Sequence, residues 1–304
     1  GGGLGYVTPI ATLIRWFPDR RGLVTGLAVG GYGLGSFVLG NLGPALILDL
    51  GIARTFYIWG GTSLVIVLAA ASVLKDPPAG WAGRFGPSGA GMALPVPCSY
   101  TLREALHSGR FWVLWTMLLV SMTAGLGLIS QLSPMAQELM MRGRAGGVSG
   151  DEARAIVLAS GAVVAVAGLF NSLGRLAWSW LSDVIGRKAV FALIFASMLL
   201  GFPALDRVDG IPAFAGIVFY LLACYGGTMA AMPALAADEF GHEHIGKIYG
   251  ILFTASGLAS LCGPYLFAAV REATGGFTHA LYAESAVAAF GLMLVLVLKF
   301  GKVK

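Results

Sequence analysis

Long apolar runs, separated by short polar segments, follow one another along this chain. A helix that crosses a lipid bilayer needs about 20 mainly apolar residues, and these runs have about that length. The pattern predicts nine membrane-spanning helices, near residues 1–17, 22–48, 56–74, 111–135, 155–181, 189–205, 211–236, 248–270 and 280–299. No charged flank and no initiator methionine precede the first run, so we expect a fragment that lacks the earlier helices of a longer protein.

The composition supports a membrane protein and disfavours several other classes. Hydrophobic residues make up 57% of the 304 residues and charged residues 12%, whereas about a quarter of the residues in soluble proteins are charged. The spans hold no phosphate-binding loop and no paired catalytic carboxylates, so we expect neither an enzyme nor a cofactor. His242 and His244 lack the further ligands of a metal site, and the basic residues are sorted among loops rather than gathered for a nucleic acid.

The basic residues of the loops predict the orientation in the membrane. Thirteen lie in one set of loops: Arg15, Arg20, Arg21, Lys75, Arg84, Arg103, Arg110, Arg187, Lys188, Lys247, Lys299, Lys302 and Lys304. Six lie in the opposite set: Arg54, Arg142, Arg144, Arg154, Arg207 and Arg271. Because cytoplasmic loops carry the excess of Lys and Arg, the first set and the C-terminus are predicted to be cytoplasmic. We expect a multi-pass monomer in a cell membrane, the inner membrane of a bacterium.

The connection over residues 75–110 divides the chain. Its first part is rich in Pro and Gly, which exclude a continuous helix, whereas Thr101 and Glu104 form a capping-box pattern ahead of a short interfacial helix. Three predicted spans precede this connection and six follow it. We therefore expect the remainder of an N-terminal helix bundle over 1–74, a cytoplasmic linker over 75–110, and a six-helix bundle over 111–304.

One polar segment resembles a known family motif. LSDVIGRK, at residues 181–188, is similar to the Gly-x-x-x-Asp-x-x-Gly-Arg-Lys motif of the major facilitator superfamily, which lies between helices 2 and 3 and recurs between helices 8 and 9. The motif's first glycine is replaced here by Trp178 or Ser179, according to the spacing. Residues 5–35, and KDPPAGW at 75–81 followed by YTLREAL and FWVLW, resemble the oxalate/formate antiporter branch of this superfamily.

The resemblance implies an all-α polytopic membrane fold of two six-helix halves, of which this chain would hold helices 4 to 12. The motif residues Asp183, Gly186, Arg187 and Lys188 are then expected to form a conformational latch at the cytoplasmic face. The dipole of its own helix disfavours a carboxylate at position 183, so Asp183 is better placed against Arg187 and Lys188 or a neighbouring helix N-terminus. A contact made in one conformation only biases the conformational equilibrium. The alternative is a solvated loop.

Arg175 is the basic residue that falls inside a predicted span. It lies about 12 Å from Asp183 along a helix, within a hydrocarbon core of about 30 Å, where an arginine costs roughly 2.5–3.5 kcal/mol. A polar stripe at helical spacing contains this arginine: Asn171, Arg175, Ser179 and Ser182. We expect the stripe to line an aqueous cavity.

The counter-ion of Arg175 is predicted to be the substrate. Nearly all carboxylates fall in loops, and Glu284 alone is expected at membrane depth. A structural Arg175–Glu284 pair is therefore the alternative. A guanidinium binds a carboxylate through two parallel hydrogen bonds, and the resemblance likewise implies that a helix-8 arginine binds the anionic substrate. Glu284 is also the candidate proton site if transport is coupled to protons.

Further residues are expected to complete the substrate site. The resemblance implies a lysine on helix 11 in members that handle oxalate, but Ser256 takes its place here. A single cation suits a monocarboxylate better than the oxalate dianion. Tyr6, Tyr32 and Tyr225 fall on helices that border the cavity in the superfamily, and each can donate a hydrogen bond. For each tyrosine, and for Gln131, helix packing is an equal alternative.

Together these features predict a secondary active transporter of small organic anions, either mono- or dicarboxylates, that works by alternating access. Anion exchange and proton coupling both remain open. A permease of the same fold for a drug or a sugar is the alternative, although the scarcity of buried acids argues against cationic drugs. A channel or a membrane-embedded enzyme is disfavoured, because the sequence shows none of the ring-forming motifs of selectivity filters. The expected partners are the carboxylate and the lipid bilayer.

Overall fold

A computed structural model describes most of the chain. It covers residues 2–17, 51–78, 81, 99–142, 149–241 and 243–297, together with single positions between 18 and 50. Within these ranges the side chains of residues 2–7, 11 and 154 lie outside the description. Every regular element in the described part is helical, as the apolar pattern predicts.

From α4 (Leu102–His107) onward the helices follow one another with short connections. In chain order they are α1 (Gly2–Trp16), α3 (Ile52–Val73), α4 (Leu102–His107), α5 (Gly109–Met141), α6 (Gly150–Ile185), α7 (Arg187–Asp206), α8 (Ile211–Phe240), α9 (Ile245–Leu252), α10 (Thr254–Thr274) and α11 (Thr278–Val297). Among the described residues, seven helical segments are long and apolar enough to cross a membrane, with α9 and α10 counted as one segment, Ile245–Thr274. These seven correspond to the predicted spans from 56–74 to 280–299.

The two remaining predicted spans lie near the N-terminus. Helix α1 has 15 residues, fewer than a bilayer-spanning helix usually needs. The span predicted over 22–48 lies outside the described residues except at single positions.

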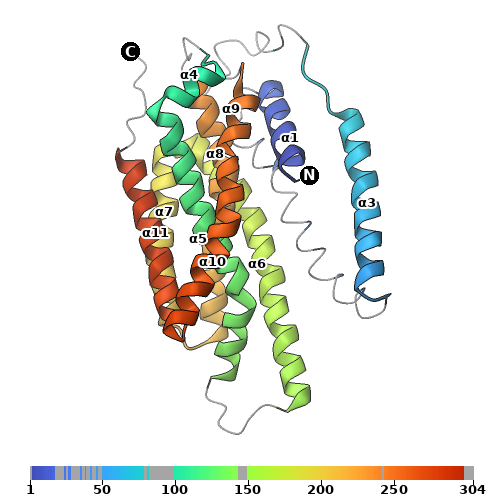
Figure 1. Ribbon diagram of the computed structural model, residues 1–304, viewed down its shortest axis with the longest axis vertical. Helices are drawn as coiled ribbons and strands as arrows, with labels where there is room; N and C mark the ends of the chain where they lie inside the picture. Colours follow the sequence, from blue (N-terminus) through green and yellow to red (C-terminus); the bar gives the residue numbers. More distant parts are fainter. Residues whose placement is uncertain are drawn as a thin grey trace.

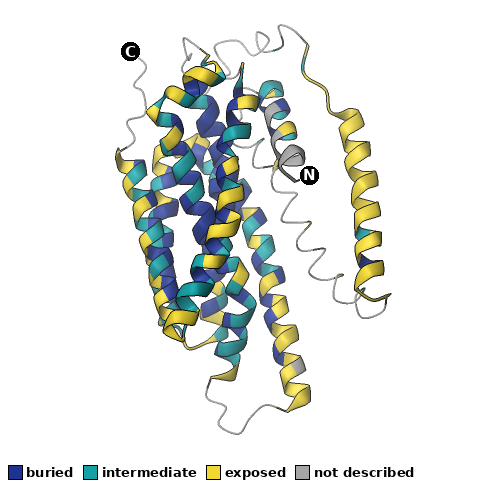
Figure 2. Cartoon of the chain, in the orientation of Figure 1, coloured by how far each residue is buried: buried dark blue, intermediate teal, exposed yellow. Residues whose placement is uncertain are grey.

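Helices α5 to α8, α10 and α11 form one bundle (Figure 1). α5 and α8 lie at its centre, and α6 packs mainly against α8, α10 against α5, and α11 against α7 and α5. Buried residues face the interior of the bundle in Figure 2. Large apolar side chains, among them Leu200, Leu261 and Leu296, are exposed on the outside. Such a surface suits contact with lipid tails.

The bundle has two distinct ends. The end called here the α4 end carries α4, α9, the junction of α6 with α7, and the last turn of α8 (Figure 1). The opposite end carries the last turn of α5, the first turn of α6, and the junctions of α7 with α8 and of α10 with α11. Every charged residue of the predicted latch lies at the α4 end.

Helix α4 begins with the predicted capping box. The Thr101 hydroxyl accepts the Glu104 backbone N–H, and the Glu104 carboxylate accepts the Thr101 backbone N–H at 2.7 Å. The Thr101 backbone N–H, and then its hydroxyl, hold the pKa of Glu104 below its ordinary value. Ala105 is fully buried, and the Tyr100 backbone N–H donates to the Phe240 carbonyl at 2.9 Å. A short helix forms where the capping box predicts it and packs against α5 and α9, while the segment just before it is bonded to the end of α8.

Helix α1 is tied to the start of the connection that follows α3. Arg15 pairs with Asp76 at 2.9 Å, and the Trp16 indole donates to the Lys75 carbonyl at 2.8 Å. The Trp81 indole in turn donates to the Trp16 carbonyl at 2.9 Å, and the two rings meet edge to face. The KDPPAGW segment therefore has a structural role at the end of α1.

Helix α3 stands apart from the bundle in Figure 1. Thr55 is its one buried residue, and nearly all of its apolar side chains are exposed (Figure 2). The division into 1–74, 75–110 and 111–304 stays a prediction.

Candidate functional site

Arg175 lies on α6 and is turned into the bundle, with 6% of its surface exposed. Its Nε donates to Asn171 Oδ1 at 3.2 Å, one turn earlier on the same helix. Ser179 and Ser182 are buried on the same face. Helix α6 is unbroken from Gly150 to Ile185, so the polar stripe is one buried face of a continuous helix.

Close packing against α8 positions this face. A Cβ added to Gly226 of α8 would lie 2.5 Å from Asn171 Oδ1 and 3.1 Å from Arg175 Cγ. A Cβ added to Gly174 of α6 would lie 2.6 Å from the carbonyl carbon of Ala223. Glycine at both positions lets the two backbones approach closely. The stem of Arg175 is thereby held between its own helix and α8.

Tyr225 joins this group from α8, beside Gly226. Its side chain is almost completely buried. Its ring packs against Gly125 of α5, where an added Cβ would lie 2.5 Å from the ring Cγ. Tyr225 directly precedes Gly226, the residue of α8 that packs against Asn171 and Arg175. Three of the predicted substrate residues, Asn171, Arg175 and Tyr225, therefore gather where α5, α6 and α8 meet.

Two other predicted substrate residues, Gln131 and Ser256, are not part of this group. Gln131 of α5 lies nearer the opposite end, where its Oε1 accepts a hydrogen bond from Arg271 Nη1 at 3.0 Å. Ser256 of α10 donates to the carbonyl of Phe253, the residue between α9 and α10, at 2.7 Å, and α10 packs mainly against α5 and α11. Tyr32 lies outside the described residues, and of Tyr6 only the helical backbone is described.

The predicted latch residues meet at the α4 end. Gly186 forms the turn between α6 and α7 with a φ of +91°, a conformation that glycine adopts without a steric penalty. Arg187 pairs with Asp183 at 2.6 Å and, through Nε, with Asp238 of α8 at 3.0 Å. It also donates to the Ser182 hydroxyl. One guanidinium thus joins the ends of three helices.

Lys188 also contacts α11 at this end of the bundle, because its Nζ donates to the Leu296 carbonyl at 3.3 Å. Arg187 therefore contacts the end of α8, and Lys188 contacts the end of α11.

The sequence did not identify Asp238 as the partner of Arg187. The apolar pattern predicts a loop at Asp238 and Glu239, whereas both lie in the last turn of α8. Glu239 pairs with Arg110 of α5 at 3.1 Å, and its side chain is 7% exposed. One feature of the sequence could have indicated these ion pairs. The two acids stand together at the end of a span that is predicted to finish on the side with the excess of Lys and Arg.

Glu284 of α11 is completely buried. Neither of its carboxyl oxygens has a hydrogen-bond partner among the described residues. Its carboxyl carbon would lie 3.3 Å from a Cβ added to Gly127 of α5. Since Arg175 packs against α8 and Glu284 faces α5, the alternative of a structural Arg175–Glu284 pair is wrong.

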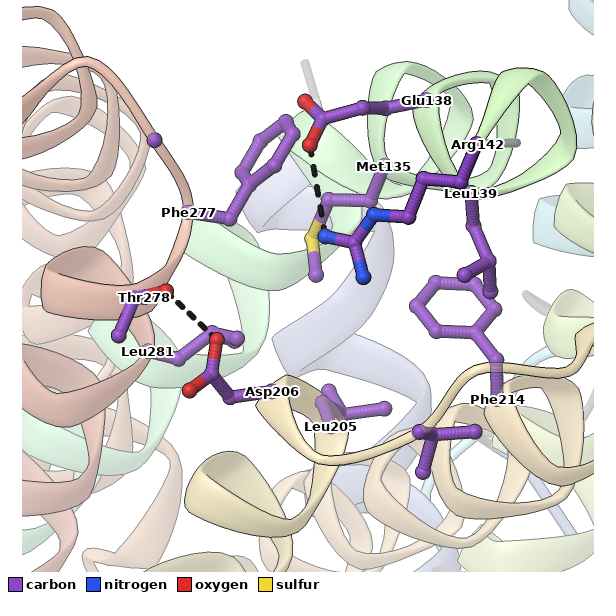
Figure 3. A pocket seen from close by; sticks show the side chains of 12 residues that line it. Met135, Glu138, Leu139, Arg142, Leu205, Asp206, Phe214, Phe277, Thr278 and Leu281 are labelled. Atoms are coloured by element: carbon purple, nitrogen blue, oxygen red, sulfur yellow. Dashed lines mark hydrogen bonds and ion pairs between the residues drawn. The ribbon is translucent and has the colours of Figure 1, made fainter. Parts of the chain in front are cut away.

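Two small cavities lie at the opposite end of the bundle. One, of about 110 Å³, is lined by residues of α5, α7, α8 and α11 (Figure 3). Figure 3 shows Arg142 beside Glu138 at 3.5 Å, and the Thr278 hydroxyl donating to Asp206 at 2.6 Å. The other cavity, of about 320 Å³, is lined by Gln131, Ala268, Arg271, Glu272 and Gly275.

Within the described part of the chain, no group of three or more acidic, histidine or cysteine side chains is placed to hold a metal ion.

Comparison with known protein families explains both the helix bundle and the sequence motif at the α6–α7 turn. The family model described as Major Facilitator Superfamily matches residues 1–150 and 147–304. The chain belongs to this superfamily. This superfamily consists of multi-pass membrane transporters and not of enzymes, and the resemblance drawn from LSDVIGRK is confirmed.

Three relatives show how far the likeness extends. The chain is 30% identical to the oxalate:formate antiporter of Oxalobacter formigenes over 309 residues, which cover 99% of this chain and 68% of that protein. It is 30% identical to the uncharacterized MFS-type transporter YhjX of Escherichia coli, over 86% of this chain and 60% of that protein. It is 26% identical to apicoplast pyruvate carrier 1 of Toxoplasma gondii, over 90% and 58%. The chain thus spans between 58% and 68% of the length of these relatives.

Proposed function

We propose that this protein is a secondary active transporter of small organic anions that works by alternating access. The observation that carries the proposal is a buried guanidinium, Arg175, on the spanning helix α6 of a major facilitator superfamily member. The names of two relatives, an oxalate:formate antiporter and a pyruvate carrier, support a carboxylate as the substrate class.

Arg175 is proposed to bind the carboxylate. A guanidinium stays charged at every physiological pH and presents its donors in a planar fork that matches two carboxylate oxygens. Asn171 holds the Nε edge of this fork at 3.2 Å, which fixes the plane in which the guanidinium lies. Tyr225 adds a hydroxyl from the neighbouring helix. Charge-assisted hydrogen bonds of this kind are about twice as strong as neutral ones.

A monocarboxylate is favoured over a dianion. Between Thr254 and Val270, α10 holds no basic residue, and Ser256 stands where a second cation would be expected. One guanidinium neutralises one negative charge, so a second carboxylate would be left without a cationic partner in a site shielded from water. Formate, lactate and other 2-hydroxy or 2-oxo acids have the required single charge.

The cluster of Asp183, Arg187 and Asp238 is proposed to act as the latch of the transport cycle. Its two ion pairs connect α6, α7 and α8 at the α4 end. If these pairs are made in one conformation and broken in the other, they bias the equilibrium by their difference in free energy. In this proposal the α4 end and the C-terminus face the cytoplasm of a bacterium, and the protein functions as a monomer in its inner membrane.

A permease for a neutral or cationic substrate is the second candidate. Counterflow in proteoliposomes of the complete protein separates the two. Vesicles preloaded with unlabelled formate, lactate or oxalate are diluted into the labelled anion, and parallel vesicles receive a sugar or a cationic dye. Uptake of labelled lactate or formate that exceeds uptake of oxalate supports the proposal. Counterflow of the sugar or the dye without any counterflow of carboxylates would refute it.

A further inference from the structure

Glu284 is a buried acidic residue to which the substrate site assigns no role. Its residue surface is 0% exposed, and both carboxyl oxygens are without a hydrogen-bond partner in the described structure. Placing an ionised carboxylate in apolar surroundings without a partner is so costly that such a group takes up a proton instead. These surroundings therefore suit Glu284 in its protonated, neutral form and not as an ionised carboxylate.

The surroundings of Glu284 come from three helices. On one side lies Gly127 of α5, which has no side chain to separate its backbone from the carboxyl group. A Cβ added to Gly127 would also lie 3.2 Å from the Gly263 carbonyl of α10, so α5, α10 and α11 converge here. On the other side, the neighbouring Ser285 donates to the Leu199 carbonyl of α7 at 2.7 Å. Close backbone packing, rather than a polar pocket, encloses the acid.

No charged group of these helices lies beside Glu284 in the described structure. Towards the opposite end, the charged or titratable groups nearest in sequence on each element are Glu138 and Arg142 on α5, Asp206 on α7, Arg271 and Glu272 on α10, and His279 on α11. The distance along each helix is counted from the residue near Glu284 or Ser285, namely Gly127 on α5, Leu199 on α7, Gly263 on α10 and Glu284 itself on α11. At 1.5 Å per residue, each charged or titratable group lies at least about 7 Å from that residue. Cys262, Tyr265 and Tyr282 are exposed on the outside of the bundle.

Residues lining the two cavities at the opposite end lie about one helical turn from Glu284 itself or from Gly127, which contacts it. Leu281, three residues before it on α11, lines the smaller cavity (Figure 3). Gln131, four residues beyond Gly127 on α5, lines the larger one. One turn of helix is about 5.4 Å. A modest separation of α5 from α11 would let water from either cavity contact the carboxyl group.

Helix α5 has a place where such a separation can start. Pro134 lies inside it, between Gln131 and Glu138. Proline removes a backbone hydrogen bond and is a frequent origin of bends in membrane helices. A bend at Pro134 would shift the Gly127 face relative to α11.

We propose that Glu284 is the proton-binding group of a proton-coupled transport cycle. It holds its proton in the closed α5–α11 contact described here and exchanges that proton with water when α5 moves away. This inference rests on the proposed function, since it presumes an anion that the proton accompanies. The protein would then carry a proton together with the monocarboxylate as a symporter, in addition to simple anion exchange.

The test separates proton coupling from anion binding. Complete wild-type protein and the Glu284→Gln variant are reconstituted, and each is assayed for lactate counterflow at equal pH and for lactate accumulation driven by an inward proton gradient. Protein-free vesicles correct for permeation of undissociated acid. Because the neutral amide mimics the protonated acid, Glu284→Gln should keep counterflow but lose accumulation down to the no-gradient level. Asp151→Asn, which changes an exposed acid of α6 that lines neither cavity, should accumulate lactate like the wild type.

Three results would overturn the inference: gradient-driven accumulation by Glu284→Gln, loss of counterflow as well in a folded variant, or wild-type exchange that ignores the proton gradient. All three leave carboxylate transport itself intact in the wild type. Absence of every carboxylate activity from the wild type would instead refute the proposed function.

Protonation of Glu284 can also be measured without transport. Dicyclohexylcarbodiimide reacts with protonated carboxyl groups in apolar surroundings, and peptide mass spectrometry locates the adduct. Wild-type protein in liposomes should be modified at Glu284 at neutral pH, with less adduct as the pH is raised, and Glu138 should remain unmodified. Absence of the Glu284 adduct under mildly acidic conditions that modify exposed carboxyls would contradict a protonatable acid at this position.

Discussion

Arg187, the first residue of α7, donates through Nε to Asp238 in the last turn of α8 at 3.0 Å. The two residues are 51 positions apart in the chain, and the same guanidinium pairs with Asp183 at the end of α6 at 2.6 Å. The planar fork of arginine can serve two carboxylates at once, which a lysine at position 187 could not do with the same geometry. The superfamily motif in this chain is therefore completed by an acid that lies outside the motif.

Asp238→Asn and Asp183→Asn should have similar effects on transport. If the Arg187 pairs hold one conformation, weakening either pair shifts the conformational equilibrium and changes the maximal rate more than the half-saturating substrate concentration. Initial rates of lactate counterflow over a range of concentrations measure both. Asp209→Asn, an exposed acid at the opposite end, serves as the control. A large loss of apparent affinity with an unchanged maximal rate would contradict the latch.

Gly186→Ala should destabilise the protein through its backbone. At a φ of +91° an L-residue with a Cβ is strained, which costs roughly 1–2 kcal/mol. Thermal unfolding of detergent-purified protein should show a lower midpoint for Gly186→Ala than for Gly150→Ala. The control glycine also has open space around it but no positive φ. Equal midpoints would show that the turn tolerates a side chain.

The helical fold was predictable because each span has enough apolar residues to identify it by length alone. The short helix α4 was predictable for a different reason, since Thr101 and Glu104 stand at the capping-box spacing and the structure forms both bonds. The boundaries of α5 and α6 were less predictable. Both helices extend beyond their apolar cores, to Met141 and from Gly150, because polar turns can continue a helix outside the lipid.

Gly226→Ala should disturb the Arg175 group directly. An added Cβ would lie 2.5 Å from Asn171 Oδ1 and 3.1 Å from Arg175 Cγ, so either α8 or the polar stripe must shift, at a cost of typically 1–3 kcal/mol. Carboxylate counterflow should fall together with the unfolding midpoint. Gly216→Ala on the same helix meets nothing within 4 Å and should leave both unchanged. Normal counterflow in Gly226→Ala would show that the close α6–α8 approach is not needed for transport.

The grouping of site residues depended on which faces of which helices meet, and a single sequence carries little of that information. Asn171 and Arg175 could be paired by their spacing along α6. The approach of Tyr225 to them depends instead on two glycines outside α6, Gly125 of α5 and Gly226 of α8. Gln131 is polar and could bind a substrate by its chemistry alone, but its position along α5 places it beside Arg271. Composition identified these residues as unusual but could not assign them to a common site.

Tyr225→Phe should weaken anion binding without unfolding the protein. The ring keeps its contact with Gly125, while the lost hydroxyl removes one hydrogen bond to the substrate, worth about 0.5–1.5 kcal/mol. The half-saturating concentration for lactate should rise by roughly two- to twelvefold. Tyr220→Phe is the control on the same helix as Tyr225; it removes a hydroxyl that is hydrogen-bonded to Ser197 of α7 and should change the half-saturating concentration little. An unchanged half-saturating concentration in Tyr225→Phe would mean that this tyrosine serves only in packing.

Arg175 itself gives the most direct test of carboxylate binding. Complete protein carrying Arg175→Ala or Arg175→Lys is reconstituted beside Arg207→Ala, which removes an exposed arginine at the opposite end, and lactate and formate counterflow are measured in all three. Arg175→Ala should fall to the level of protein-free vesicles, Arg175→Lys should retain weak counterflow because it keeps the charge but loses the fork, and Arg207→Ala should match the wild type. Wild-type counterflow in a folded Arg175→Ala protein would contradict the assignment of Arg175 as the anion-binding residue.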